Sequence, residues 1–359
     1  MSTNKEEFKK RLLEKKEQTL FHNHATSYMR AEAEEDLREF PEKSDSFRTC
    51  FQIDIERIIL SKAFRRLKHK TQVFWTPTND HVRTRLTHTI EVVNLSKIMA
   101  NLLGLNVDLT EAIALAHDIG HTPFGHAGER ALQECLNEYN ISFNHADFGA
   151  DIVVRKKGQI SGKPYKGLNL TKYTIDGIKY HSWGSKKRPS TLEGQVVRYA
   201  DMISYISHDY DDFNEMGVPL SRELRDYIQS LGTTRSERIN KLIDDIIENS
   251  YNNDKVQMSP DKEEICNKIL QEMMDNIFQS GSWQRREKGA KFIIQNLFTH
   301  WTTEPDSVIK ESLPEEIFKR LQEGNKIEII YTYIACMTDN YCIEQYRRIF
   351  SPEILNYYW

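Results

Sequence analysis

The chain has few of the features that a secreted or membrane-spanning protein needs. Its five cysteines are an odd number and lack paired Cys-x-x-Cys spacing. This usage argues against a disulfide framework or a zinc ribbon and is typical of the cytosol. The first residues lack the apolar stretch of a signal peptide, and no run approaches about 18 apolar residues, the length that a membrane span needs. We therefore expect a cytoplasmic protein that neither spans nor anchors in a membrane.

The chain also lacks an excess of charge of either sign. It carries 49 basic against 53 acidic residues, a formal net charge of −4. Because no global basic field is present, the composition does not indicate nucleic acid as a partner. We find no internal repeat and no low-complexity segment. With 39% hydrophobic residues among 359, the chain can bury a large core, and one or two domains are expected.

Signals for β-strands are scarce, whereas helical periodicity recurs along the chain. Residues 5–19 predict a charged, exposed helix, and residues 50–70 predict one helix with a basic end. Residues 73–80, an extended piece followed by a turn, predict the one short hairpin, whereas residues 158–166 predict a loop. A clear apolar stripe with helical spacing follows later in the chain, at Ile239, Leu242, Ile243, Ile246 and Ile247. We therefore expect an all-α fold with at most one short hairpin.

The most informative stretch is residues 117–129, which hold three histidines and two carboxylates. On a helix His117 and His121 share one face, and Asp118 can turn an oxygen toward a shared ion. Imidazole with carboxylate suits Mn²⁺, Fe or Zn and, with added water, Mg²⁺. A break near residues 123–125 and a new helix near His126 would bring His126 and Glu129 beside the ion as a proton-transfer pair.

Further polar residues come from distant helices. His88 lies at the start of a helix with an apolar face, which runs to about residue 102. Downstream, Asp201, Tyr205 and Asp209 repeat at intervals of four residues, so one helical face carries two acids and a phenol. Because the opposite face of this helix is apolar, we expect the stripe to form one wall of a polar cleft.

These residues together carry a family resemblance. The order His88, His117-Asp118, Asp201 resembles the H…HD…D signature of the HD-domain metal-dependent phosphohydrolases. The sequence is more closely similar to the deoxyguanosinetriphosphate triphosphohydrolase branch, the bacterial dNTP triphosphohydrolases. The similarity covers roughly residues 45–215 and is carried by residues 51–59, 63–67, 70–74, 117–129 and 167–171, with residues 337–339 beyond it.

The resemblance implies a role for each matching residue. The implied metal ligands are His88, His117, Asp118 and Asp201, and the implied catalytic pair is His126 and Glu129. The positions that match the lining of the nucleotide site are Arg85, His121, His145, Tyr205 and Asp209, with Gln72 matching a sugar-contacting position. The chain departs from the family pattern at Ala146, Met202 and Cys342, none of which is an implied ligand.

The resemblance also implies an architecture and an activity. We expect an N-terminal arm and loop (1–49), an HD-domain helical bundle (50–215) and a helical C-terminal lobe packed on it (216–359). The implied reaction is hydrolysis of dGTP or other dNTPs to deoxynucleoside and triphosphate, with Mn²⁺, Mg²⁺ or Fe as the metal. Such enzymes are generally homo-oligomers, often hexamers, and a second dNTP is a candidate effector. The apolar stripe from Ile239, together with Tyr331, Tyr333 and residues 357–359, offers surface for assembly.

Two other interpretations stay open at this point. An HD phosphohydrolase could act on a monophosphate, a guanosine alarmone or a cyclic dinucleotide, although the motifs from residue 51 to 74 argue against it. A nucleotide sensor or single-strand nucleic-acid binder could keep the site for regulation alone. The presence of all four ligands together with His126 and Glu129 argues against an inactive protein.

Overall fold

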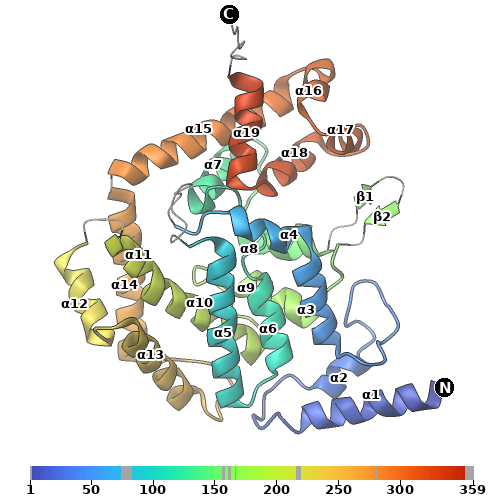
Figure 1. Cartoon of the computed structure of the whole chain (residues 1–359), viewed down its shortest axis with the longest axis vertical. Helices are drawn as coiled ribbons and strands as arrows, with labels where there is room; N and C mark the ends of the chain where they lie inside the picture. The colour runs from blue at the N-terminus through green and yellow to red at the C-terminus, as the bar shows by residue number, and fades with distance from the viewer. Residues whose placement is uncertain are drawn as a thin grey trace, which may run out of the picture.

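The computed structural model describes residues 2–73, 83–155, 158–160, 163–165, 167–215, 220–279 and 281–351, and most of them are helical (Figure 1). The strands β1 (Gly158–Ile160) and β2 (Lys163–Tyr165) form an antiparallel hairpin, which is the sheet of this part of the chain. The predicted all-α fold is therefore confirmed. No helix in these ranges is long and apolar enough to cross a bilayer.

The helices follow one another with short connections. The first half contains α1 (Ser2–Glu17), α2 (Tyr28–Ala33), α3 (Cys50–Leu60), α4 (Lys62–Arg66), η1 (Leu67–His69), α5 (Arg85–Leu103), α6 (Val107–Ala116), α7 (Gly125–Asn137), α8 (His145–Asp147), η2 (Phe148–Arg155), α9 (Lys172–Tyr180), α10 (Leu192–Ser204), η3 (Tyr205–Asp209) and α11 (Tyr210–Glu215). The second half contains α12 (Arg222–Leu231), α13 (Arg235–Ser250), α14 (Pro260–Gln279), α15 (Gly281–Thr303), α16 (Asp306–Ser312), α17 (Glu315–Leu321), α18 (Lys326–Ala335) and α19 (Asp339–Phe350).

Local capping signals decide where the helices near the site begin and end. The Thr84 side chain accepts a hydrogen bond from the Thr87 amide and Thr87 returns one, so α5 starts one turn before His88. Ser61 caps α4 by accepting from the Phe64 amide. The single helix predicted over residues 50–70 is therefore wrong, because this cap starts a new helix and leaves the three pieces α3, α4 and η1.

The hairpin lies elsewhere than predicted. Residues 158–166, predicted as a loop, hold β1 and β2, which pair Gly158 with Tyr165 and Ile160 with Lys163. Strands of three residues are too short to show a period, and Pro164 is tolerated because a two-stranded ribbon has only edge strands. The hairpin predicted at residues 73–80 falls largely on residues 74–82, which lie outside the described residues, and it stays a prediction.

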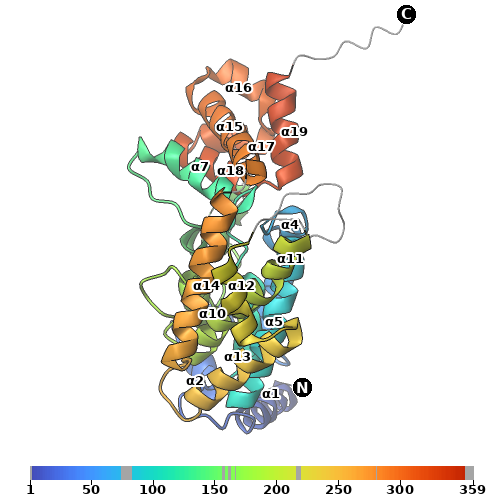
Figure 2. The same ribbon diagram turned by 90° about the vertical axis from the view of Figure 1, so that its left-hand side faces the viewer.

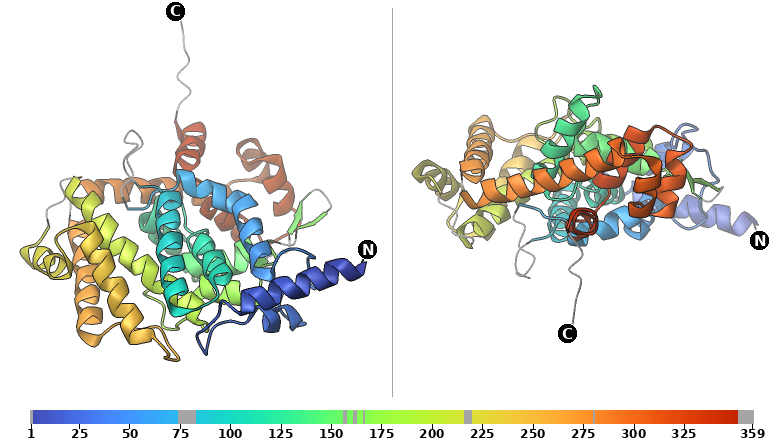
Figure 3. Two further views of the ribbon diagram at one scale, coloured as in Figure 1. Left: turned by 60° about the horizontal axis from the view of Figure 1, so that its bottom comes forward. Right: turned by 90° about the horizontal axis from the view of Figure 1, so that it is seen from above.

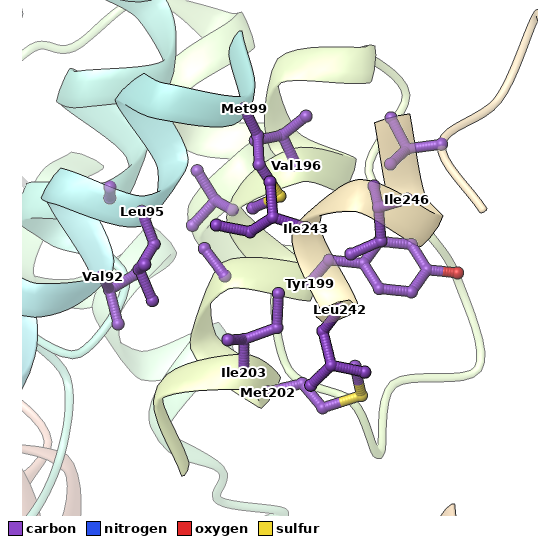
Figure 4. Packing of buried hydrophobic residues seen from close by; sticks show 14 of the residues in the cluster. Val92, Leu95, Met99, Val196, Tyr199, Met202, Ile203, Leu242, Ile243 and Ile246 are labelled. Carbon is purple, nitrogen blue, oxygen red and sulfur yellow. The ribbon is translucent and has the colours of Figure 1, made fainter. Parts of the chain in front are cut away.

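The helices of the first half form a bundle that the second half covers. α5 packs against α6 and α10, and α13 lays Leu242, Ile243 and Ile246 across α5 and α10 (Figure 4). Leu242 and Ile246 are fully buried. Burying such a side chain stabilises the fold by about 1.5–3 kcal/mol. The predicted helix of the Ile239 stripe is present, and its apolar side chains lie mainly in the core.

α14 and α15 form an outer arc around the bundle (Figures 1 and 2). α15 packs against α7, α18 and α19 and buries Trp301 in a second apolar cluster, which also contains residues of α3, α6 and α9. The same arrangement is seen from below and above in Figure 3. Because both apolar clusters combine side chains from before and after residue 216, the second half holds the site in place, and the division at 215/216 stays a prediction.

Candidate metal centre and nucleotide pocket

The four implied metal ligands come from α5, the end of α6 and α10, and they converge. His88 Nε2 lies 3.0 Å from Asp201 Oδ1 and 4.0 Å from Asp118 Oδ2, and His117 Nε2 lies 3.9 and 3.6 Å from the same two oxygens. Metal bonds of about 2.0–2.2 Å place two donors on one ion about 3 to 4.4 Å apart. The four donors therefore surround a space of the size that one divalent ion needs.

The state of His117 shows that these residues fit a metal. The Nδ1–H of His117 donates to the Ala114 carbonyl at 2.7 Å, so Nε2 carries the lone pair. That Nε2 is buried and has no hydrogen-bond partner among the described residues. An unsatisfied buried polar atom costs about 1–3 kcal/mol, and a metal ion would satisfy this one. Two imidazoles with two carboxylates are a donor set for Mn²⁺, Fe or Zn.

His88 and Asp201 form a buried pair at the centre of this cluster. Burial alone would raise the pKa of Asp201, but the hydrogen bond from His88 and the nearby His117 lower it to about 2. Burial would lower the pKa of His88, but the Asp201 carboxylate raises it to about 8. A metal ion at this position would therefore displace a proton from His88 as it binds.

The segment from His117 to His121 is a turn, so the predicted shared helical face is wrong. α6 ends at Ala116, and His121 turns its Nε2 to Asp118 Oδ1 at 3.0 Å. Gly120 explains the turn, because a Cβ at this position would lie 2.1 Å from the His145 carbonyl and 2.4 Å from the Gly149 amide. Only glycine permits this close approach, which brings His145 to the His117-Asp118 turn.

The implied catalytic pair lies at the start of α7, which begins at Gly125 near the predicted residue. His126 Nδ1 is 3.8 Å from Glu129 Oε2, and the His126 side chain is 47% exposed, so it can reach a ligand. Glu129 also accepts from the His145 amide at 3.0 Å and from His145 Nδ1 at 3.1 Å. Burial would raise the pKa of Glu129, but His145 and His126 hold it well below its usual range.

His121 and His145 stack with ring centroids 3.7 Å apart. Burial and the neighbouring Arg85 hold the pKa of His121 well below its usual range, so His121 is neutral. Burial would also lower the pKa of His145, but the Glu129 carboxylate raises it instead. The two rings therefore differ in their affinity for a proton although they touch, because only one of them faces Glu129 closely.

A cavity of about 600 Å³ opens beside the four ligands. The predicted residues that line it are Gln72, Arg85, His88, Asp118, His121, His126, His145, Asp201 and Tyr205. Residues that the sequence did not single out complete the wall, among them His181, Trp183 and Met202, with Asn267, Gln271 and Met274 from α14. Nothing in the local sequence marks the α14 residues, because their place in the wall depends on how the outer arc folds back. His181 carried a signal, since it ends α9 as His117 ends α6.

Asp209 is the predicted pocket residue that does not line the cavity. Residues 205–209 form the π-helical turn η3, which rotates Asp209 away from the α-helical face of Asp201 and Tyr205. Burial raises the pKa of Asp209 to about 7, and neither carboxylate oxygen has a hydrogen-bond partner among the described residues. Its predicted role in substrate binding stays a prediction.

The segment at residues 337–339 fixes the cavity wall from the C-terminal side. Asp339, 3% exposed, accepts from the Thr71 amide, the Thr71 hydroxyl and the Phe124 amide. Lys70 is also buried, and its ammonium donates to the carbonyls of His121 and Ala335. Burial lowers the pKa of Lys70 to about 7. These contacts hold the segments before and after the metal ligands against α18 and α19.

We expect Asp339→Ala to destabilise the protein by about 3–5 kcal/mol, because it leaves three buried donors without their acceptor. Urea unfolding followed by circular dichroism measures the change. Asp306→Ala, at an exposed position of α16, serves as the control and should change stability by less than about 1 kcal/mol. Equal midpoints for both variants would show that the Asp339 contacts do not hold the wall.

Comparison with known proteins agrees with this geometry. An HD domain model matches residues 85–206, which contain all four converging ligands, and a phosphohydrolase-associated domain model matches residues 256–348. A deoxyguanosinetriphosphate triphosphohydrolase-like protein of Caldanaerobacter subterraneus subsp. tengcongensis is 43% identical over 87% of both chains. Proteins of the same description from Clostridium tetani and Desulfatibacillum aliphaticivorans are 40% and 36% identical, over 88% of this chain and 90% and 91% of theirs. The chain therefore belongs to the deoxyguanosinetriphosphate triphosphohydrolase-like family of HD-domain proteins.

Proposed function

We propose that the protein is a metal-dependent hydrolase that converts deoxynucleoside triphosphates to deoxynucleoside and inorganic triphosphate. The observation that carries this proposal is the convergence of His88, His117, Asp118 and Asp201 at a cavity that also holds His126. The cavity volume of about 600 Å³ is in the range of sites for ligands of nucleotide size. A divalent ion bound by the four ligands would polarise a phosphate oxygen and lower the pKa of a bound water.

Arg85 is the cation that lies closest to this centre. Its guanidinium is 2% exposed and donates from Nη1 to Asp118 Oδ2 at 2.8 Å. The Nε–H of Arg85 is buried and has no partner among the described residues. Because Arg85 lines the cavity, this donor is available for an oxygen of the α-phosphate, where a charge-assisted hydrogen bond stabilises developing charge.

His126 is the proposed general acid. When water attacks the α-phosphorus, the bond from phosphorus to the 5′ oxygen breaks, and this oxygen leaves with a proton from the imidazolium of His126. Glu129 stabilises the protonated ring from 3.8 Å and also fixes His145, so the two imidazoles take defined positions around one carboxylate. His121 and His145 border the same region of the cavity and are proposed to contact the phosphates.

Tyr205 is the proposed reader of the sugar. It lies one turn beyond Asp201 and lines the cavity, and its hydroxyl lies 3.7 Å from the sulfur of Met274 on α14. A ring held in this way and packed on C2′ leaves no room for a 2′ hydroxyl. Gln72 and Asp209 are proposed to serve the 3′ hydroxyl, although Asp209 would have to become accessible from the cavity.

We expect Tyr205→Ala to relax selectivity between GTP and dGTP by roughly 10-fold or more, since sites reject a misfitting group by about 1–3 kcal/mol. The ratio of kcat/KM for the two nucleotides measures the effect. Tyr205→Phe keeps the ring and should keep the wild-type ratio. A wild-type enzyme that hydrolyses GTP and dGTP equally would contradict the steric role of Tyr205.

Chromatography of the products from each dNTP, with Mn²⁺ or Mg²⁺ added, tests the proposed function. We expect deoxynucleoside and inorganic triphosphate in equal amounts. A parallel panel of a deoxynucleoside monophosphate, a guanosine alarmone and a cyclic dinucleotide covers the other HD reactions. Turnover confined to that panel, or filter binding of oligonucleotides without any turnover, would replace the proposal with one of the alternatives.

We also propose that the protein forms a closed, symmetric homo-oligomer, with a hexamer as one candidate. The Ile239 stripe does not supply the surface, because it is largely buried, and Tyr331 and Tyr333 pack against the second apolar cluster. Residues 357–359 lie outside the described residues. Exposed apolar side chains occur instead on α5, at Ile90, Ile98 and Leu102. Light scattering during size-exclusion chromatography measures the mass, and a fully active monomer would contradict this proposal.

A further inference from the structure

Asp118 belongs to two groups of potential metal ligands. One group is His88, His117 and Asp118, and the other is Asp118, His145 and His181, with ligand atoms within 4.8 Å of one another in each group. We propose that the second group binds a second divalent metal ion and that Asp118 bridges the two ions. This inference rests on the first metal site of the proposed function and adds an ion that the proposed reaction does not itself require.

His181 is prepared as a ligand in the same way as His117. It follows the last residue of α9, is 1% exposed, and donates from Nδ1 to the Ile178 carbonyl at 2.7 Å, three residues before it. His117 makes the equivalent bond to Ala114 at the same distance. In both residues the bond fixes the tautomer and leaves the Nε2 lone pair free. No described residue hydrogen-bonds Nε2 of His181, although a buried histidine in a core normally has its polar atoms paired.

His145 is oriented by a carboxylate. Its Nδ1 lies 3.1 Å from Glu129 Oε2, and its amide donates to the other oxygen of Glu129 at 3.0 Å. A carboxylate on one ring nitrogen is a common support for an imidazole that binds metal through the other. The His145 and His181 rings are 5.4 Å apart, and the His117 and His181 rings are 5.1 Å apart. His181 therefore lies between the two groups of ligands.

Asp118 has the geometry that a bridging ligand needs. Its Oδ2 lies 3.6 Å from His117 Nε2, and its Oδ1 lies 3.0 Å from His121 Nε2, so its two oxygens face different neighbours. One carboxylate can hold two ions about 3.5–4 Å apart, the separation found in two-metal hydrolytic sites. Two ions on one face of the cavity would also offset the charge of a polyphosphate better than one.

The donor set indicates the class of ion. Two imidazole nitrogens and one shared carboxylate suit Mn²⁺, Fe or Zn, whereas Mg²⁺ prefers oxygen donors and keeps its waters. Donors on one ion lie at most about 4.4 Å apart, so the side chains of His145 and His181 have to move by only a few tenths of an ångström to close the site. Water or phosphate oxygens would complete the coordination from the cavity.

Metal counting on the full chain tests the inference without substrate. The protein is stripped with a chelator, saturated with Mn²⁺, desalted, and analysed for manganese and by electron paramagnetic resonance. We expect two ions per chain with a spin-coupled spectrum in the wild type. His181→Ala and His181→Gln should each keep one ion and show the signal of isolated Mn²⁺. His22→Ala, at a buried histidine beside the Ser250 carbonyl and away from the cavity, is the control and should keep both ions.

A wild-type protein that binds one ion per chain at saturation would overturn the inference, whether or not the variants fold. His181 variants that keep both ions, or that lose both while circular dichroism shows a native fold, would also overturn it. Because no nucleotide is present, these outcomes do not depend on the reaction that the protein catalyses. A protein with two ions and no dNTP hydrolysis would retain the second site and remove the proposed function.

Discussion

Asp201→Ala is expected to remove the metal and to abolish turnover. Asp201 supplies the oxygen that lies 3.0 Å from His88 Nε2 and 3.9 Å from His117 Nε2, so its loss opens the site on the side of α10. Contacts that merely orient a ligand are worth about 10- to 100-fold in metal affinity, and a ligand itself should be worth more. We therefore expect a loss of more than about 100-fold in both metal affinity and kcat/KM.

Elemental analysis after desalting measures retention of the metal in Asp201→Ala. His117→Ala should behave in the same way, because its Nε2 has no other partner among the described residues. Asp226→Ala, at an exposed position of α12, removes the same carboxylate far from the ligands and should leave the metal content unchanged. Full occupancy in both ligand variants would refute the assignment of these residues.

His126→Ala should lower kcat by about 10²- to 10⁴-fold while the metal and the fold are kept, since this is the usual contribution of general acid catalysis. His126 is not among the converging ligands, and its side chain is half exposed, so its removal leaves no buried atom unpaired. The dNTP is expected to bind with a similar KM. Turnover at the wild-type rate would show that another group protonates the leaving oxygen.

A substrate with a better leaving group separates this role from a structural one. An aryl phosphate ester such as bis(4-nitrophenyl) phosphate releases an anion that needs no proton at neutral pH. His126→Ala should therefore lose far less activity on this ester than on dGTP. Equal losses on both substrates would mean that His126 positions the phosphate and does not donate the proton.

The parts of the fold that could be predicted are those with local signals. The start of α5 before His88 follows from the capping threonines, and the break before α7 follows from Pro123 and Gly125. The four converging ligands could be selected because residue type and spacing already suited a metal. The break at Ser61 was missed, because a serine cap inside an apolar periodic run resembles a solvent-exposed helical position.

Other parts of the site depend on tertiary structure and could not be predicted. Asn267 and Met274 reach the cavity only because α14 folds back along the bundle, and their own sequence has no motif. The displacement of Asp209 results from a π-helical turn, which changes the period within one continuous helical pattern. His181 could have been noticed by analogy with His117, but only the structure shows that both present Nε2 beside Asp118.

Hydrolysis of dGTP in ¹⁸O-labelled water, followed by ³¹P nuclear magnetic resonance, tests the central claim most directly. Attack of water on the α-phosphorus places the label on a terminal phosphate of free triphosphate and none in the deoxyguanosine. We predict this labelled triphosphate as the product of the Mn²⁺-loaded protein and its absence with Asp201→Ala. Release of pyrophosphate with dGMP, of phosphate with dGDP, or label in the 5′ hydroxyl of the nucleoside would contradict the proposed reaction.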